Sequence, residues 1–376
     1  MLYEIHMLKN YPPTNLNRDD TGAPKTCLFG GAMRGRISSQ CLKRSWRTSA
    51  IFQCDIGENA VGIRTRNLPV VVCEKLLALG EDEEKVNVLC DRIPELLGLH
   101  KDSKKVITKE IVFCAPADVE AVVIAMQKLL AECKKAKDIA ALKADSKQGK
   151  ALREELKNVR PVTLDIALFG RMVTSDAFRD VEASMQVAHA ISTNKVSVES
   201  DFFTAMDDVL SSSTLEDIGA GMLGDVDFNS SCYYVYVSLD TDALAENLKY
   251  AENAEEIVRQ AIPALLRAMA FTDPSGKQNS FAGHVLPSVV MVECKEKKIP
   301  TSMVNAFVEP VGKSGDMVAL SARKLADEVD MTARNFGLEV KQRLWFCVDK
   351  YDIKPETATK ICATFPELVE SVSASL

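Results

Sequence analysis

CYYVYVSL, residues 232–239, predicts a β-strand, because its aromatic and β-branched residues are typical of one. Two other stretches share this character, YEIHML at residues 3–8 and SVVMVEC at residues 288–294. Both show strand-like alternation or a β-rich composition. Since the three stretches lie far apart in the chain, the sequence predicts a sheet assembled from distant segments.

Helical patterns separate the N-terminal stretch, residues 3–8, from the other two. They cover residues 73–99 and 117–160, and apolar residues in the second recur at helical spacing on one face. That face consists of Val119, Val122, Val123, Met126, Leu129, Leu130 and Cys133. Strands interleaved with helices, and a late pair of strands, predict an α+β sheet domain that carries a helical insertion.

The predicted insertion ends in a stretch rich in lysine and alanine, residues 133–160, which stops before Pro161. This stretch is predicted to be a solvated, protruding helix. Two interpretations stay open for it. It either makes a second contact with nucleic acid or is an ordinary charged helix face, which is the commoner case.

Length and cysteine usage restrict the class of protein. A chain of 376 residues is longer than one core usually supports, so sizeable insertions are expected. Its eleven cysteines contain no C-x-x-C pair and its four histidines lie far apart, which predicts neither a disulfide framework nor a zinc site. No apolar run is long enough to span a bilayer, and we expect a cytoplasmic protein without metal or cofactor.

The charge of the chain is segregated. Residues 25–47, KTCLFGGAMRGRISSQCLKRSWR, contain six lysines or arginines and no acidic residue, although the formal net charge of the chain is -7. The first 70 residues contain 10 basic and 5 acidic side chains, a balance of +5, so the rest of the chain carries -12. This pattern favours a polyanion bound at one local surface.

A helix is expected to begin within this basic stretch at Ser38 or Ser39, either of which can cap a first turn. Helical spacing then gives a cationic face of Gln40, Lys43 and Arg47 and an apolar face of Leu42 and Trp46. Free amides at the helix start and the cationic face together would form a phosphate cradle. A solvated basic helix is the alternative.

A nucleotide-binding P-loop is disfavoured. Gly30 and Gly35 have the G-x-x-x-x-G spacing, but Arg36 and Ile37 follow where the motif needs Lys and then Ser or Thr. Without that hydroxyl the chain lacks the motif's ligand for magnesium, so we do not expect a nucleotide triphosphatase.

Residues 16–47, LNRDDTGAPKTCLFGGAMRGRISSQCLKRSWR, resemble the N-terminal signature of the CasC family, the backbone subunit of the type I-E CRISPR surveillance complex Cascade and a member of the RAMP superfamily. Three later blocks resemble successive family segments in the same order. These are DIALFGRMVTS (165–175), MQVAHAISTNKVSVESDFFTAMDD (185–208) and GKQNSFAGHVLPSVVMVECKEKKIPTSMVNAF (276–307). Where the familiar pattern often has a basic residue after FGG, this chain has Ala32 and Met33.

The resemblance implies an RRM-like, ferredoxin-like palm with a helical fingers insertion and a β-hairpin thumb. Residues 1–56 and 161–376 would form the palm, 57–160 the fingers, and 193–230 the thumb within the palm portion. The chain has no aromatic RNP motif of the kind that ordinary RRM domains use, so base stacking on the sheet is not expected.

The resemblance also implies a non-catalytic subunit. Several copies, typically six, would wind along a CRISPR RNA together with other Cascade subunits and present its spacer for pairing with target DNA. A thumb in related subunits displaces a base at every sixth position. The protein would then act as a ruler along the guide.

The resemblance places phosphate contacts on six residues of the N-terminal block: Arg18, Ser38, Gln40, Lys43, Arg44 and Arg47. It places a guide-kinking role on Arg171 and Met172, where Met172 would wedge beside a displaced base. Without the resemblance, a buried core methionine is the commoner case. Lys277 and Gln278 lie in a turn-like setting and would contact the guide or the next subunit.

Two other classes compete with this interpretation. The first is a metal-dependent target-RNA endonuclease, for which Asp19 with Asp20, or Asp207 with Asp208, are the available carboxylate pairs. Neither pair has a nearby histidine base, and Asp19 and Asp20 are as well explained by a turn beside Arg18. The second is a self-assembling scaffold that binds no RNA.

Overall fold

The computed structural model describes residues 1–57, 61–205, 222–312 and 315–376. The chain forms two compact units. The first contains Met1–Phe52, Gln186–Leu239 and Ile262–Leu376, and the second contains Gln53–Met185 and Asp240–Ala261. Residues 57–160, the predicted insertion, lie within the second unit.

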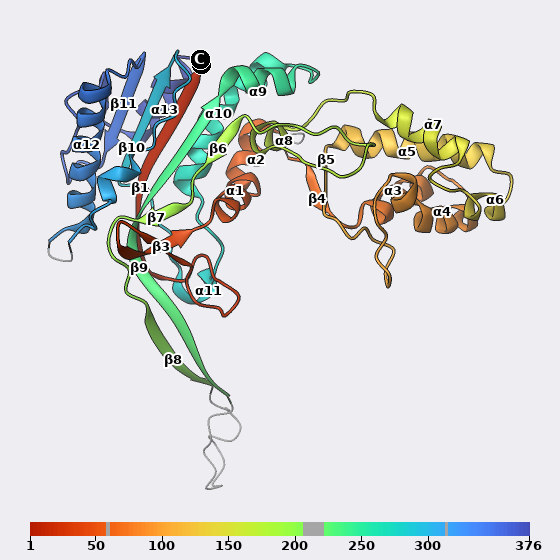
Figure 1. The fold of residues 1–376 in the computed structure, drawn as a ribbon, viewed down its shortest axis with the longest axis horizontal. Helices are drawn as coiled ribbons and strands as arrows, with labels where there is room; N and C mark the ends of the chain where they lie inside the picture. Colours follow the sequence, from red (N-terminus) through yellow and green to blue (C-terminus); the bar gives the residue numbers. More distant parts are fainter. Residues whose placement is uncertain (58–60, 206–221, 313–314) are drawn as a thin grey trace, which may run out of the picture. The chain divides into compact units, whose positions relative to one another are not determined.

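A large mixed sheet organises the first unit (Figure 1). The three predicted stretches form its central strands, β1 (Leu2–Thr14), β9 (Met222–Asp240) and β10 (Val289–Lys295). β1 lies between the other two and is antiparallel to β10, with Leu8 opposite Val289. The predicted α+β class, with a sheet built from distant segments, is confirmed.

Shorter strands extend this centre on both sides. The order across the sheet is β12 (Lys360–Cys362), β11 (Gln342–Cys347), β10, β1, β9, β7 (Ala190–Ser192), β3 (Ala32–Ile37) and β2 (Thr26–Phe29). β6 (Met185–Val187) and β8 (Glu199–Ala205) also pair with β9. β11 and β12 are parallel, whereas β2, β3, β7 and β9 pair antiparallel in turn.

Helices cover both faces of the sheet, so the central strands are buried on both sides. The helices that belong wholly or partly to this unit are α1 (Ser39–Arg47), α2 (Ala50–Ile56), α10 (Ala254–Phe271), α11 (Gln278–Phe281), η3 (Met303–Phe307), α12 (Met317–Phe336) and α13 (Phe365–Ser373). On one face, Trp345 of β11 packs with Phe307 and Leu325. On the other face, the ring centroids of Phe365 and Phe346 lie 6.3 Å apart.

A chain of buried charges crosses the central strands. Glu4, Glu293 and Arg343 occupy facing positions on β1, β10 and β11. Arg343 donates to Glu293 at 2.5 Å, and Lys295 pairs with both Glu293 and Glu4. His6 lies on the same side, its Nδ1 2.8 Å from the Tyr234 hydroxyl, and burial lowers its pKa to about 4. Buried charges of this kind are tolerated because each has an opposite partner.

β8 and β9 form a hairpin that extends away from the sheet (Figure 1). Glu199 pairs with Phe228 at its base and Phe203 with Gly224 farther out. The predicted thumb, 193–230, contains this hairpin, and its residues 206–221 lie outside the described part of the chain.

The second unit is mainly helical. Its elements are β4 (Ile63–Thr65), α3 (Leu68–Ala78), α4 (Glu83–Leu96), β5 (Val112–Cys114), α5 (Pro116–Glu132), α6 (Ala136–Ala140), α7 (Lys147–Leu156), α8 (Leu164–Phe169) and α9 (Thr241–Leu248). β4 and β5 form a small antiparallel sheet, and the apolar face predicted for α5 lies in the core.

Two predictions for this unit are wrong. Residues 133–160 do not form one helix but divide into α6 and α7, because Ser146 caps a new helix start by accepting from the Gly149 amide at 3.1 Å. A disulfide, which the cysteine pattern did not predict, joins Cys73 to Cys90. Packing of α3 against α4 brings these two residues together, and their spacing in sequence does not reveal it. None of the helices in the described ranges has both the length and the apolar composition required to cross a membrane.

Candidate nucleic-acid interface

A tight hairpin organises the basic stretch of the first unit. Gly30 and Gly31 both adopt left-handed φ, 58° and 73°, and connect β2 to β3 in a two-residue turn. A side chain at Gly30 would place its Cβ 1.9 Å from the Val308 carbonyl oxygen, so only glycine fits there. This register sets Lys25 beside Arg36, whose backbone amide donates to the Lys25 carbonyl at 2.8 Å.

Helix α1 follows the hairpin and begins where the sequence predicts. Ser38 is its N-cap, and the Ser38 hydroxyl oxygen accepts from the Cys41 amide at 3.3 Å. The Ser38 amide in turn donates to Asn17 Oδ1 at 2.9 Å. Leu42 and Trp46 are buried, as predicted for the apolar face. Ser38 itself is buried, so its first role is to hold the start of the helix.

The cationic face of α1 differs from the predicted one. Arg47 is only 7% exposed, so it does not lie on an open cationic face, and that part of the prediction is wrong. Its position next to Trp46, at the buried end of the helix, explains this burial. Lys43 is half-buried, and burial lowers its pKa. The exposed polar face instead contains Gln40 and Arg44, which are four residues apart.

A groove of about 520 Å³ lies beside the start of α1. It is lined by Leu16, Asn17, Arg18, Asp19, Asp20, Thr21, Gly22, Cys41, Ser275 and Gly276. Asp19 shapes its wall, because Asp19 Oδ1 accepts from the Thr21 hydroxyl at 2.7 Å and from the Thr21 and Ala23 amides. These bonds lower the pKa of the Asp19 carboxyl. The Arg18 side chain is exposed on the same groove.

Lys277 directly follows Ser275 and Gly276, two residues that line the groove. It has a left-handed backbone, with φ at 51°, immediately before α11. The preceding Gly276 packs against the end of β1 so closely that a Cβ would lie 2.3 Å from the Leu16 carbonyl oxygen. Asp273 anchors the segment by accepting from Lys9 and from Tyr11, each at 2.7 Å. A left-handed lysine held by such contacts is typical of a functional position.

Sequence reasoning missed a cluster of Lys25, Arg36 and His189. Arg36 Nη1 lies 3.1 Å from His189 Nδ1, which must accept because a guanidinium only donates. Burial lowers the pKa of His189, and the charges of Arg36 and Lys25 lower it further. The two cations were visible in the sequence, whereas His189 is brought to them by the pairing of β3 with β7.

Four cations of this region lack a carboxylate partner in the described part of the chain: Arg18, Lys25, Arg36 and Arg44. They lie on one unit and are exposed or half-exposed. We call these four residues the cationic surface. Unpaired cations gathered on one surface attract an anion, and phosphates satisfy both their charge and their hydrogen-bond donors.

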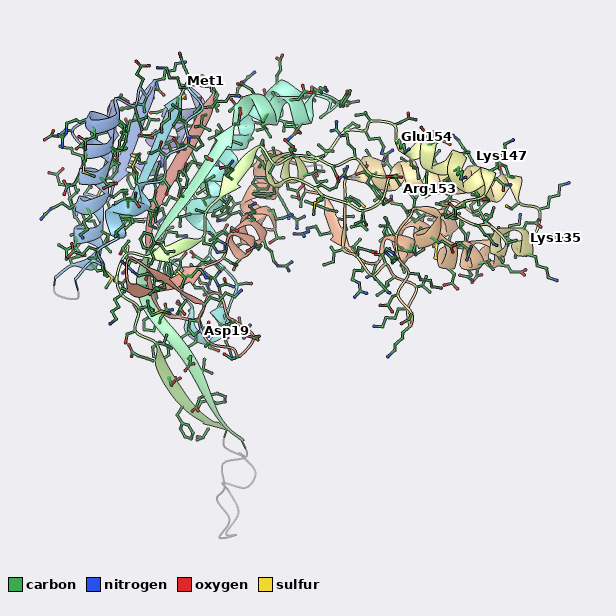
Figure 2. All side chains as sticks on the ribbon, viewed as in Figure 1. Met1, Asp19, Lys135, Lys147, Arg153 and Glu154 are labelled. Carbon is green, nitrogen blue, oxygen red and sulfur yellow. A yellow bond between two sulfur atoms is a disulfide. The ribbon has the colours of Figure 1, made fainter. Side chains whose placement is uncertain are left out.

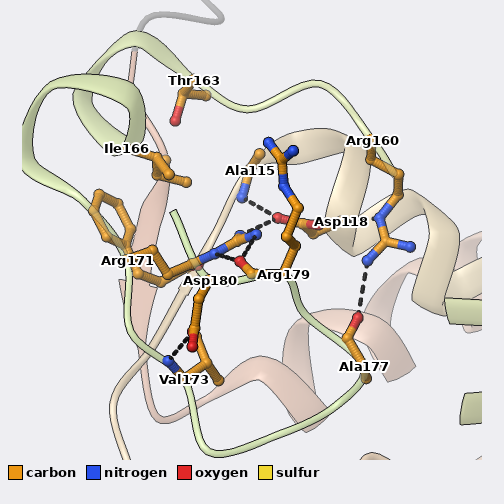
Figure 3. Close-up of polar contacts among 12 residues, drawn as sticks. Ala115, Asp118, Arg160, Thr163, Ile166, Arg171, Val173, Ala177, Arg179 and Asp180 are labelled. Atoms are coloured by element: carbon orange, nitrogen blue, oxygen red, sulfur yellow. Dashed lines mark hydrogen bonds and ion pairs between the residues drawn. The ribbon is translucent and has the colours of Figure 1, made fainter. Parts of the chain in front are cut away.

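Arg171 and Met172 belong to the second unit. Arg171 points inward, with its side chain 2% exposed, and donates to Asp118 at 2.6 Å and to the Arg179 carbonyl at 2.7 Å (Figure 3). The guide-kinking role of Arg171 stays a prediction, and in this structure the guanidinium donates to groups of the protein. Met172 is 93% exposed, which excludes the alternative of a buried core methionine.

Two exposed phenylalanines mark the β8–β9 hairpin. Phe202 is 63% exposed and Phe203 is 39% exposed, on successive positions of β8. Their run in SDFFT was visible in the sequence, but only their exposure distinguishes them from core residues. Lone exposed aromatics are common on protein surfaces, and an adjacent pair on a projecting hairpin is available for stacking.

A family model and two solved structures match the chain over nearly its full length. Residues 3–371 match the family model described as CT1975-like protein. One solved structure, titled "CRISPR RNA-guided surveillance complex, pre-nicking", contains a chain that is 26% identical over the full length of both chains, with a TM-score of 0.86. A chain from another, titled "CRISPR RNA-guided surveillance complex", is 21% identical over the full length of both, with a TM-score of 0.75, and shows the shared fold. No curated protein matches the sequence.

Proposed function

The chain belongs to the CT1975-like protein family, and from this we propose that it is the backbone subunit of a CRISPR surveillance complex of the type I-E Cascade kind. Several copies, typically six, bind one CRISPR RNA together with other Cascade subunits. They present the spacer for pairing with target DNA. The sheet of the first unit is the RRM-like palm of this subunit, the second unit contains the fingers, and the β8–β9 hairpin belongs to the thumb. We place this activity in the cytoplasm.

The observation that carries the proposal is the cationic surface. Arg18, Lys25, Arg36 and Arg44 have no carboxylate partner within the described ranges, although the chain as a whole is acidic. A phosphate backbone can pair with these side chains and release its counterions. Gln40, Lys277 and half-buried Lys43 would supply further donors to the phosphates.

The sheet itself supports a backbone-reading mode. RRM domains usually stack bases on an open face of the sheet. Here β1 and β10 are buried at nearly every position, so neither face of the central sheet is open to a base. The guide would instead follow the hairpin of β2 and β3 and the start of α1.

Met172 and the β8–β9 hairpin supply apolar surface for displaced bases. The exposed thioether of Met172 would insert beside an unstacked base, and Phe202 would offer an exposed ring for another contact. Arg171 acts behind Met172, because its guanidinium is buried in contacts with protein.

A second contact with nucleic acid is favoured on the helical unit. Six lysines of α6, α7 and their flanking loops are exposed and have no carboxylate partner among the described residues: Lys134, Lys135, Lys137, Lys143, Lys147 and Lys150. Figure 2 shows Lys135 and Lys147 projecting from the α6–α7 end of this unit. Nearby lysines are paired, as Lys128 is with Glu155 and Lys157 with Glu154. The lysines at this end lack the carboxylate partners that nearby lysines have, which favours binding of phosphate over an ordinary salt-bridged helix face.

We propose that the subunit is not an enzyme. Asp19 is engaged in three turn hydrogen bonds, so its carboxylate serves the wall of the groove. Asp207 and Asp208, the other predicted pair, lie outside the described residues.

Co-expression with a CRISPR array and companion subunits tests the proposal. The purified complex is extracted, and its nucleic acid is run on a denaturing gel before and after nuclease treatment. A discrete guide-length RNA, protected at a regular repeat, supports the proposal. A folded assembly that contains no RNA and survives nuclease would instead indicate a scaffold. Magnesium-dependent cutting of a complementary RNA, lost on Asp19→Asn, would indicate the endonuclease.

A further inference from the structure

Met172 follows a sharply defined turn. Helix α8 ends at Gly170, whose φ is 79°, and a Cβ there would lie 3.0 Å from both the Ala183 amide nitrogen and the Val181 carbonyl oxygen. Arg171 and Val181 then exchange two backbone hydrogen bonds of 2.8 Å. These bonds close the base of a loop over residues 171–181, and Met172 is the first residue beyond the closure.

The Arg171 side chain spans the inside of this loop. Its Nε donates to the Arg179 carbonyl at 2.9 Å and its Nη2 to the same oxygen at 2.7 Å. Its Nη1 donates to the Phe113 carbonyl at 3.2 Å and to Asp118 Oδ2 at 2.6 Å. One guanidinium therefore connects the two arms of the loop to α5 and β5.

Asp118 joins a second guanidinium to the same site (Figure 3). Its Oδ1 accepts from Arg160 Nε at 3.0 Å, and Arg160 Nη2 donates to the Ala177 carbonyl at 2.9 Å. Asp118 also caps α5 by accepting from the Ala115 amide at 2.9 Å. The middle of the loop is thus held by Arg160 and its base by Arg171, and one carboxylate links both.

The charges make Asp118 the critical member. The side chains of Asp118 and Arg171 are 2% exposed and that of Arg160 is 14% exposed. Two cations share a single anion, so removing the anion leaves two buried like charges facing each other. On the other side of Met172, the Val173 amide donates to Asp180 Oδ1 at 2.7 Å. Met172 is therefore exposed between two residues whose positions are fixed.

We propose that Asp118 is the positioning residue that holds Met172 out as a wedge, through a buried clamp that it forms with Arg160 and Arg171. The inference rests on the wedge role proposed above for Met172. It adds that the regular displacement of bases depends on a carboxylate that touches no nucleic acid. An exposed methionine on a loose loop would fold back onto the surface, whereas a clamped one presents its side chain to every guide in the same place.

The test uses the assembled complex with guide RNAs that carry 2-aminopurine at single spacer positions. An unstacked 2-aminopurine is bright, so emission reports displacement of the base at each position. The variants are Asp118→Asn and Met172→Ala. Asp138→Asn is the matched control. Asp138 caps α6 by accepting from the Lys135 amide at 2.9 Å, as Asp118 caps α5, but it pairs with no guanidinium of the described residues.

We expect Asp118→Asn and Met172→Ala to retain the guide at full stoichiometry and to lose the periodic bright positions. Asp138→Asn should keep them. In Asp118→Asn, the Val173 amide should exchange hydrogen at least about tenfold faster, because hydrogen bonds to a charged group are lost. A purely stabilising role for Asp118 would lower the melting temperature and leave the bright positions in place.

A double variant, Asp118→Asn with Arg171→Met, serves if the single change fails to fold. It returns the site to one positive charge but leaves the loop without its cross-links, so it should fold and still lose the bright positions. Bright positions that persist in a folded Asp118 variant, with Met172→Ala dark, would overturn the inference and leave the proposed function intact. Bright positions that persist in Met172→Ala as well would overturn the wedge itself. Absence of guide from the wild-type complex would overturn the proposed function.

Discussion

Replacing Lys25 and Arg44 together with alanine should weaken RNA binding without disturbing the fold. Burial raises the pKa of the Cys41 thiol, and the charges of Lys25 and Arg44 act against that rise, so both cations lie near Cys41. Neither pairs with a carboxylate in the described ranges. Their removal therefore leaves no buried charge unpaired, and the melting temperature should be unchanged.

The magnitude follows from counterion release. Each phosphate contact on a single strand contributes about 0.7 to the slope of log K against log salt, so the double variant should lose about 1.4. At physiological salt the same loss corresponds to roughly tenfold weaker binding. The effect should be the same for any RNA sequence, because phosphate contacts carry no sequence information.

Fluorescence anisotropy of a labelled single-stranded RNA, titrated over a series of salt concentrations, measures this slope. Lys350→Ala is the control, since Lys350 is an exposed lysine of the same unit that pairs with Asp316 at 3.1 Å. Arg47→Ala extends the test, because its burial predicts lost stability with an unchanged slope. A folded Lys25/Arg44 variant with the wild-type slope would refute the assignment of the cationic surface.

Burial lowers the pKa of His6 from 6.5 to about 4, so the unfolded chain takes up a proton that the folded chain excludes, and up to about 3 kcal/mol of stability should be lost as the pH falls through that range. Urea unfolding of wild type and His6→Gln at neutral and acid pH measures this loss. An equal loss of stability at acid pH in both proteins would contradict the prediction. Lys277→Gly should raise stability by up to about 1 kcal/mol, because glycine relieves the left-handed backbone of this lysine, and it should weaken RNA binding. Lys277→Ala should weaken RNA binding without the gain in stability. Thermal melts measure stability and anisotropy measures binding, and a Gly variant no more stable than the Ala variant would count against backbone strain at this position. Changing Lys135 and Lys147 to glutamate should reduce binding of duplex DNA by the complex, measured by a gel-shift titration, while retention of the guide stays normal. Normal binding of duplex DNA by this variant would indicate that α6 and α7 present an ordinary charged surface.

Sequence patterns correctly predicted the elements that depend on residues close together in the chain. The strand character of residues 232–239 identified β9, and Ser38 marked the start of α1 because a cap acts on its own helix. The α+β class followed from strands separated by helical patterns. Such features need no knowledge of which segments meet in space.

The remaining features depend on contacts between distant segments. In the sequence Arg171 is a cation beside Met172 with no visible partner. In the structure it pairs with Asp118, which lies 53 positions earlier. His189 joins Arg36 only through the pairing of β3 with β7. Cys73 and Cys90 meet because α3 packs on α4. In each case a tertiary contact, invisible to periodicity or charge counts, decides what the residue does.

Ultraviolet cross-linking of the purified complex, followed by mass spectrometry of the RNA-linked peptides, would locate the guide on the protein. We expect cross-links from the guide to peptides that contain residues 25–47 and to the peptide with Met172. Cross-links confined to other surfaces, such as α12 and α13, with RNA present in the complex, would contradict the claim that the cationic surface and Met172 hold the guide.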